Sequence, residues 1–69
     1  MTDHLSITDA DGDSIDAARA SEGYGGPSDL IAVRVDAGPD YVPLAVFLTP
    51  EQVRELAEGL TALAEEVSA

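Results

Sequence analysis

The chain has 69 residues, which is enough for one small domain, and a domain of this size buries only about 60% of the surface of its unfolded chain. Fourteen acidic residues face three arginines and no lysine, and the net charge of −11 argues against direct binding to nucleic acid or to anionic membranes. The absence of cysteine excludes disulfides and thiolate metal sites.

The N-terminus, MTDHLSIT, lacks the basic segment and the long apolar run of a secretory signal. The longest apolar-rich stretch, YVPLAVFL, is shorter than the roughly 20 residues that cross a bilayer. We therefore expect a cytoplasmic location and no membrane partner.

Residues 8–16 read TDADGDSID and predict a tight hairpin. A three-residue loop, Ala10-Asp11-Gly12, places Gly12 where this class of turn needs a left-handed backbone. Cross-strand pairing around that loop then collects the apolar residues of both strands on one face. These residues are Leu5, Ile7, Ile15 and Ala17. A two-residue loop would instead place Ile7 opposite Asp16, so the hydrophobic pattern favours the three-residue loop.

The same stretch resembles the start of an EF-hand calcium loop. Asp9, Asp11 and Asp13 match the first three ligand positions of such a loop. The match then fails, because Ser14 stands where the loop needs glycine and Ala20 stands where it needs a closing glutamate. The prediction is a plain turn with no metal, and a weak calcium site at the three aspartates is the alternative.

Residues 20–28, ASEGYGGPS, predict a loop, because three glycines and a proline prevent a regular element. Tyr24 is its only large side chain. It either anchors an interface with a partner or folds back on the nearest apolar surface of its own chain.

Two further strands are predicted at 30–36 (LIAVRVD) and 41–48 (YVPLAVFL), joined by a turn at 37–40. Pro43 has no N–H for a ladder hydrogen bond, so the second of these strands is an edge strand or is bulged there. One apolar face of this strand can pack on a helix, and we expect a second copy of the protein to cover the other. The candidate interface residues on that other face are Tyr41, Pro43, Ala45 and Phe47.

A helix is predicted from Pro50 to Val67. Thr49 and Gln52 form a capping box around Pro50, which suits the first helical position. An apolar stripe then recurs with spacings of three and four residues. Its members are Val53, Leu56, Leu60, Leu63 and Val67. Gly59 interrupts the helix, either to allow a close approach of another element or because it is simply tolerated.

These elements predict a single β-β-β-β-α domain over residues 1–69. The fold class is α+β, with an antiparallel sheet of about four strands in two hairpins and one C-terminal amphipathic helix packed on one face. The pattern leaves open whether the second strand pairs with the third.

The segments ITDADGDSI and VFLTPEQVRELAEGLTALAEE resemble those of small proteins from actinobacteria and their phages, in which an LTPEQ-type helix closes the chain. The resemblance spans most of the chain and carries no known activity, so no functional residue can be transferred. It implies an actinobacterial or phage origin, and a phage-encoded protein would act in the host cytoplasm.

The residues do not form a recognisable active site. His4 is the single histidine, cysteine and lysine are absent, and there is neither a nucleophile-elbow motif nor a phosphate-binding glycine loop. We therefore expect a non-enzymatic accessory or regulatory protein that needs no cofactor, acts by protein–protein contact and self-associates. The alternatives are an acidic mimic of DNA that inhibits a basic host protein, and a weak calcium-binding module.

Overall fold

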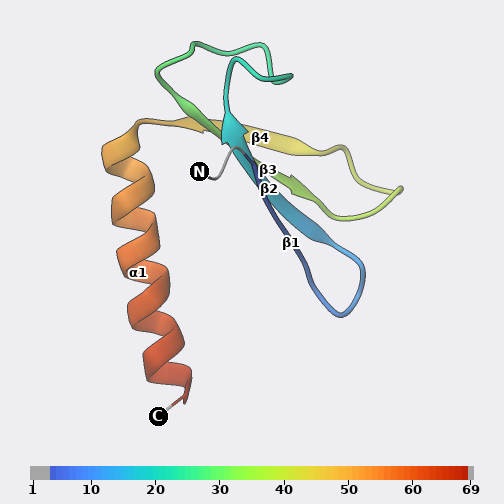
Figure 1. Ribbon diagram of the computed structural model, residues 1–69. Coiled ribbons are helices and arrows are strands. Elements are labelled where there is room, and N and C mark those ends of the chain that lie inside the picture. The colour runs from blue at the N-terminus through green and yellow to red at the C-terminus, as the bar shows by residue number, and fades with distance from the viewer. Residues whose placement is uncertain (1–3, 69) are drawn as a thin grey trace.

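The computed structural model describes residues 4–68 and shows a four-stranded antiparallel sheet followed by one helix (Figure 1). The elements in chain order are β1 (His4–Thr8), β2 (Ser14–Arg19), β3 (Ile31–Asp36), β4 (Leu44–Leu48) and α1 (Pro50–Ser68). The strands lie in the sheet in the order β1-β2-β3-β4, so β2 does pair with β3 and the sheet is a simple meander. The predicted α+β class is confirmed.

The first hairpin has the predicted loop and the predicted register. Gly12 has a φ of 89°, and its N–H donates a 3.2 Å hydrogen bond to the carbonyl of Asp9. The N–H of Asp9 in turn donates to the carbonyl of Asp13 at 2.8 Å. Ile7 then lies opposite Ile15, and every pair from His4 to Thr8 follows the same register.

The second hairpin corrects one boundary. β4 begins at Leu44, so the predicted strand over 41–48 is wrong in its first three residues. Tyr41 instead donates its N–H to the carbonyl of Gly38 at 3.3 Å, and Gly38 has a φ of 98°. This turn extends the connection as far as Pro43, which has no N–H to give to the ladder. β4 is an edge strand, as Pro43 predicted.

The helix begins with the predicted cap. The N–H of Thr49 donates to Oε1 of Gln52 at 2.9 Å, and the N–H of Gln52 donates to Oγ1 of Thr49 at 3.2 Å. This reciprocal pair is a capping box. Because Leu48 ends β4 and Pro50 begins α1, Thr49 is the whole connection between sheet and helix.

The buried core is small and lies on the sheet face away from α1. Ala20 and Ala32 are the fully buried hydrophobic residues within the described chain. The loop after β2 folds over them, and the N–H of Gly26 donates to the carbonyl of Ala20 at 3.0 Å. Only Val53 of α1 is even half-buried. The helix therefore touches the sheet near its first turns and diverges from it along the rest of its length (Figure 1).

Candidate interaction surface

One face of the sheet consists of apolar side chains. The pairing places Leu5, Ala17, Val33 and Val46 in one row across the four strands, and Ile7, Ile15, Val35 and Leu44 in the next. Leu44 is 69% exposed and Ile7 is 57% exposed. A sheet face of this composition normally packs against another layer of the same domain. Here most of it faces outward.

The apolar stripe of α1 is exposed as well. Leu56, Leu60 and Leu63 share one side of the helix, as their spacing predicts. Leu60 is 54% exposed and Leu63 is 58% exposed. The helix has no fully buried residue within the described chain. The same spacing places its five glutamates outside the stripe, although Glu55 lines the same hollow as Leu56, Leu60 and Leu63.

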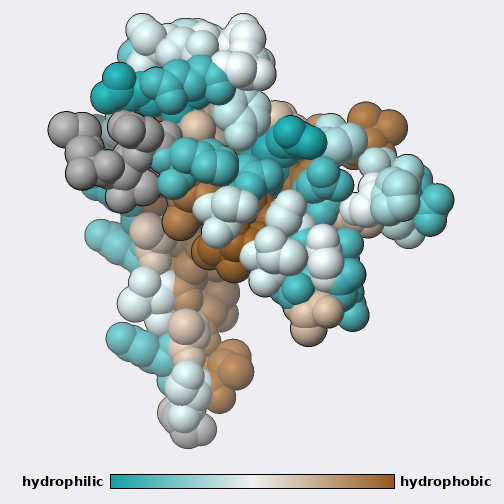
Figure 2. All heavy atoms as spheres, turned by 45° about the vertical axis from the view of Figure 1, so that its right-hand side comes forward, coloured by the Kyte–Doolittle hydropathy of each residue, from teal (hydrophilic) through white to brown (hydrophobic). Residues whose placement is uncertain are grey.

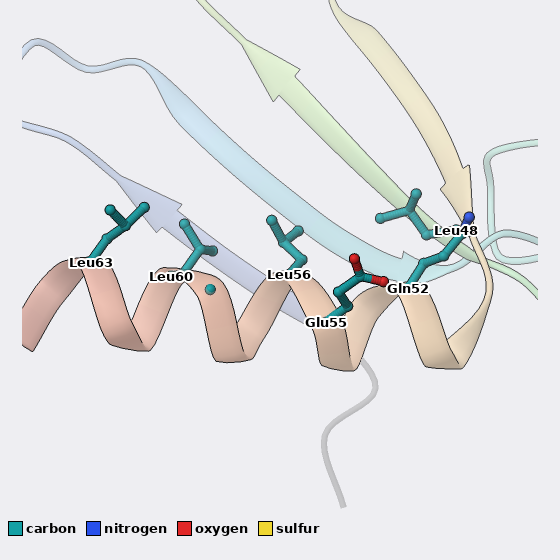
Figure 3. Close-up of a pocket in the computed structure, with 7 residues that line it drawn as sticks. Leu48, Gln52, Glu55, Leu56, Leu60 and Leu63 are labelled. Carbon is teal, nitrogen blue, oxygen red and sulfur yellow. The ribbon is translucent and has the colours of Figure 1, made fainter.

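The two apolar surfaces face each other across a gap, which we call the apolar wedge. Figure 3 shows Leu56, Leu60 and Leu63 pointing from α1 toward the strands, which converge on the helix at its N-terminal end and separate from it farther along. Hydrophobic residues gather in this hollow and along one side of α1 (Figure 2). The wedge is lined mainly by apolar residues, among them Leu5, Ile7, Ile15, Val33, Val53, Leu56 and Leu60, and also by Asp16.

The connection between β4 and α1 is as short as it can be. A single residue, Thr49, separates the strand from the helix, and its backbone and hydroxyl are held by the capping box and by a 3.0 Å bond from the N–H of Val53 to its carbonyl. All three bonds join Thr49 to the first turn of α1, so they fix the residue at which the helix begins.

The opposite face of the sheet is largely polar and partly covered. Phe47 lies there under Gly26, since a Cβ added to Gly26 would stand 3.2 Å from the Phe47 ring. Tyr24 is half-buried and shares a shallow depression with His4 and Arg34. The loop of residues 20–30 therefore covers part of the face on which the sequence placed the interface.

The five predicted interface residues lie on three different segments. Tyr41, which is 67% exposed, and Pro43 lie in the β3–β4 connection rather than on β4. Ala45 and Phe47 lie on β4, and Tyr24 lies in the loop that covers part of the sheet. The larger exposed apolar surface is the wedge.

Among the aspartates of the first turn, Asp9 holds the backbone with its carboxylate. Oδ1 of Asp9 accepts hydrogen bonds from the N–H of Asp11 at 2.9 Å and from the N–H of Asp13 at 3.0 Å. This arrangement is an Asx turn, which holds the loop in shape. From residue 4 to residue 68, no three histidine, aspartate or glutamate side chains come together as a metal site would require.

Two weak ion pairs lie on the sheet. Nη2 of Arg34 lies 3.4 Å from Oδ2 of Asp36, and Nε2 of His4 lies 3.9 Å from Oδ1 of Asp16. Both pairs are solvent-accessible and contribute at most about 1 kcal/mol each. No helix in the described part of the chain is long and apolar enough to span a membrane.

Comparison with protein families, with curated proteins and with solved structures finds no match to this chain. Function must therefore be argued from the surface itself. The sequence identified Leu5, Ile7, Ile15 and Ala17, which line the wedge, as one apolar face of the first hairpin, but it expected a helix to pack on the sheet. The sequence did contain a signal for this exposed surface. Each strand carries at least two apolar residues on the same face, and together they make an apolar surface larger than one helix can cover.

Proposed function

We propose that this protein is a small acidic accessory or regulatory protein that acts by protein–protein contact and self-associates. The observation that carries the proposal is the apolar wedge, whose two walls are exposed although each has the composition of a core. Monomeric proteins rarely expose apolar patches larger than a few hundred Å², and larger ones mark interaction sites. The proposal includes action in the cytoplasm of an actinobacterium, or of a phage host, and no catalytic chemistry.

The size of the chain supports self-association. A domain below about 70–80 residues rarely reaches adequate stability from one hydrophobic core, and such domains use disulfides, metals or oligomerisation. Cysteine is absent from the sequence, and the fully buried hydrophobic residues in the described chain are two alanines. A partner surface would supply the missing burial.

Sedimentation velocity over a micromolar to millimolar concentration series tests the proposal. We expect a folded oligomer that dissociates on dilution, with circular dichroism to follow the folded fraction in the same samples. A folded monomer at every concentration would refute self-association.

A second candidate is the binding of a basic host protein, as in mimicry of DNA. The observation in its favour is that Glu58 and Glu65 share one side of α1 with Ala62, away from the leucines. Binding of this kind weakens steeply as salt rises, because it rests on exposed charges. The test is competition with duplex DNA for a basic protein captured from the native host, using wild-type chain and a Glu58→Gln/Glu65→Gln variant. Equal competition by both would remove the basis of this candidate.

A further inference from the structure

We propose that the apolar wedge is a self-complementary dimer interface, in which α1 of each copy occupies the wedge of the other copy. The two helices would then pack side by side between two sheets. This inference rests on the proposed self-association and names its surface.

The surface area of the single chain is too large for a free monomer. A folded monomer of 7.1 kDa is expected to expose about 4,100 Å², whereas this chain exposes 5408 Å², an excess of about 1,300 Å². A stable interface of standard size buries about 800 Å² per partner, and obligate homodimers bury about 1,000 Å² or more per partner. The excess therefore matches what a stable dimer needs to bury.

The shape of the wedge fits a helix with an apolar stripe. Its walls are a sheet face and a helix side, and it widens toward the C-terminal end of α1 (Figure 3). The chain carries such a stripe in α1 itself, with Leu60 and Leu63 exposed on it. Gly59 lines the same side of the helix, and nothing lies within 4 Å of the position its Cβ would take. This glycine, which costs about 1 kcal/mol of helix stability, leaves room beside Leu60 for a neighbouring helix.

The charge distribution permits a second copy despite the net charge of −11 on each chain. Four of the five glutamates of α1 do not line the wedge, so an interface on the apolar stripe leaves them in water, whereas Glu55 lines it beside Leu56. Asp9, Asp11 and Asp13 lie at the turn that ends the β1–β2 hairpin, and all three are at the exposed tip of the sheet or beside it. Two carboxylates line the wedge: Asp16, whose Oδ1 lies 3.9 Å from Nε2 of His4, and Glu55 of α1, which is exposed. A stable apolar interface requires both to stay paired or solvated at its rim.

The simplest competing occupant of the wedge is the chain's own helix. If α1 closed onto its own sheet, the wild type would sediment as a monomer, so the test below separates the two occupants.

The test compares two substitutions that add the same charge to α1. Leu60→Glu places a carboxylate on the wedge wall, whereas Ala62→Glu places one beside Glu58 and Glu65 on the other side of the helix. We expect wild type and Ala62→Glu to sediment as dimers and Leu60→Glu to sediment as a folded monomer, with its dissociation constant raised at least a hundredfold. Dimerisation of Leu60→Glu with wild-type affinity would overturn the inference but leave the proposed self-association standing. A monomeric wild type would overturn both.

A second measurement keeps the inference testable if Leu60→Glu does not fold. Isotope-filtered NMR on a mixture of labelled and unlabelled wild-type chains detects contacts between copies only. We expect contacts from the methyl groups of Leu60 and Leu63 of one chain to those of Ile7 and Ile15 of the other. Contacts confined to Tyr41, Phe47 or the edge of β4 would overturn the inference.

Discussion

Salt should strengthen self-association of this protein. Two copies in contact lie about 26 Å apart, if each is given the 13.2 Å radius of gyration of the chain. With a net charge of −11 on each copy, screened repulsion costs about 1.4 kcal/mol at ~0.1 M salt and almost nothing at ~1 M salt. The dimer dissociation constant should therefore fall about tenfold between these two conditions. Sedimentation equilibrium in sodium chloride measures this directly.

A charge variant provides the matched control. Glu58→Gln/Glu65→Gln lowers the net charge from −11 to −9 without touching the apolar wedge, which reduces the repulsion by about a third. The variant should dimerise about twofold more tightly than wild type at ~0.1 M salt and show no difference at ~1 M salt. If self-association of wild type weakens as salt rises, ionic contacts hold the copies together and the apolar interface is wrong.

Four further predictions concern stability, each measured by urea denaturation at matched protein concentration. Gly12→Ala should destabilise the fold by about 1 kcal/mol because the φ of 89° is strained for alanine, and Gly12→Asn should cost less. Asp9→Asn should change little, since it keeps the acceptor at Oδ1, whereas Asp9→Ala should cost about 1 kcal/mol; equal losses would mean that the charge matters and not the turn. Gly26→Ala should cost about 1–3 kcal/mol because its Cβ would stand 2.7 Å from a buried methyl group, whereas Gly59→Ala in the monomeric Leu60→Glu background should gain up to about 1 kcal/mol.

The effect of Gly26→Ala also tests whether the small core on the covered face of the sheet forms within one chain. Gly26 belongs to the covered face of the sheet, where the loop after β2 packs on Ala20 and Phe47. A loss at Gly26 that persists in the Leu60→Glu background would show that this small core forms within one chain. A loss that appears only in the dimer would show that folding of the loop depends on the partner.

The sequence by itself determined the local structure. Gly12 and the alternation of Leu5, Ile7 and Ile15 were enough for the loop length and the register of the first hairpin, because a shift of one residue would turn every apolar side chain to the other face. Thr49 and Gln52 were enough for the start of α1, since both partners of a capping box lie within one turn. The start of β4 was predicted at Tyr41, three residues before its observed start at Leu44. A proline in an apolar run indicates an edge strand, but it does not indicate the residue at which pairing begins.

Only the tertiary structure decided which apolar surface is left uncovered. The sequence assigned the stripe of α1 to its own sheet and the Tyr41–Phe47 side to a partner. In the structure the loop containing Gly26 covers part of the latter side, and α1 diverges from the former. Both outcomes depend on the angle between segments that are distant in the chain. Hydrophobic periodicity specifies which side of an element is apolar, but it does not determine the angle between two elements.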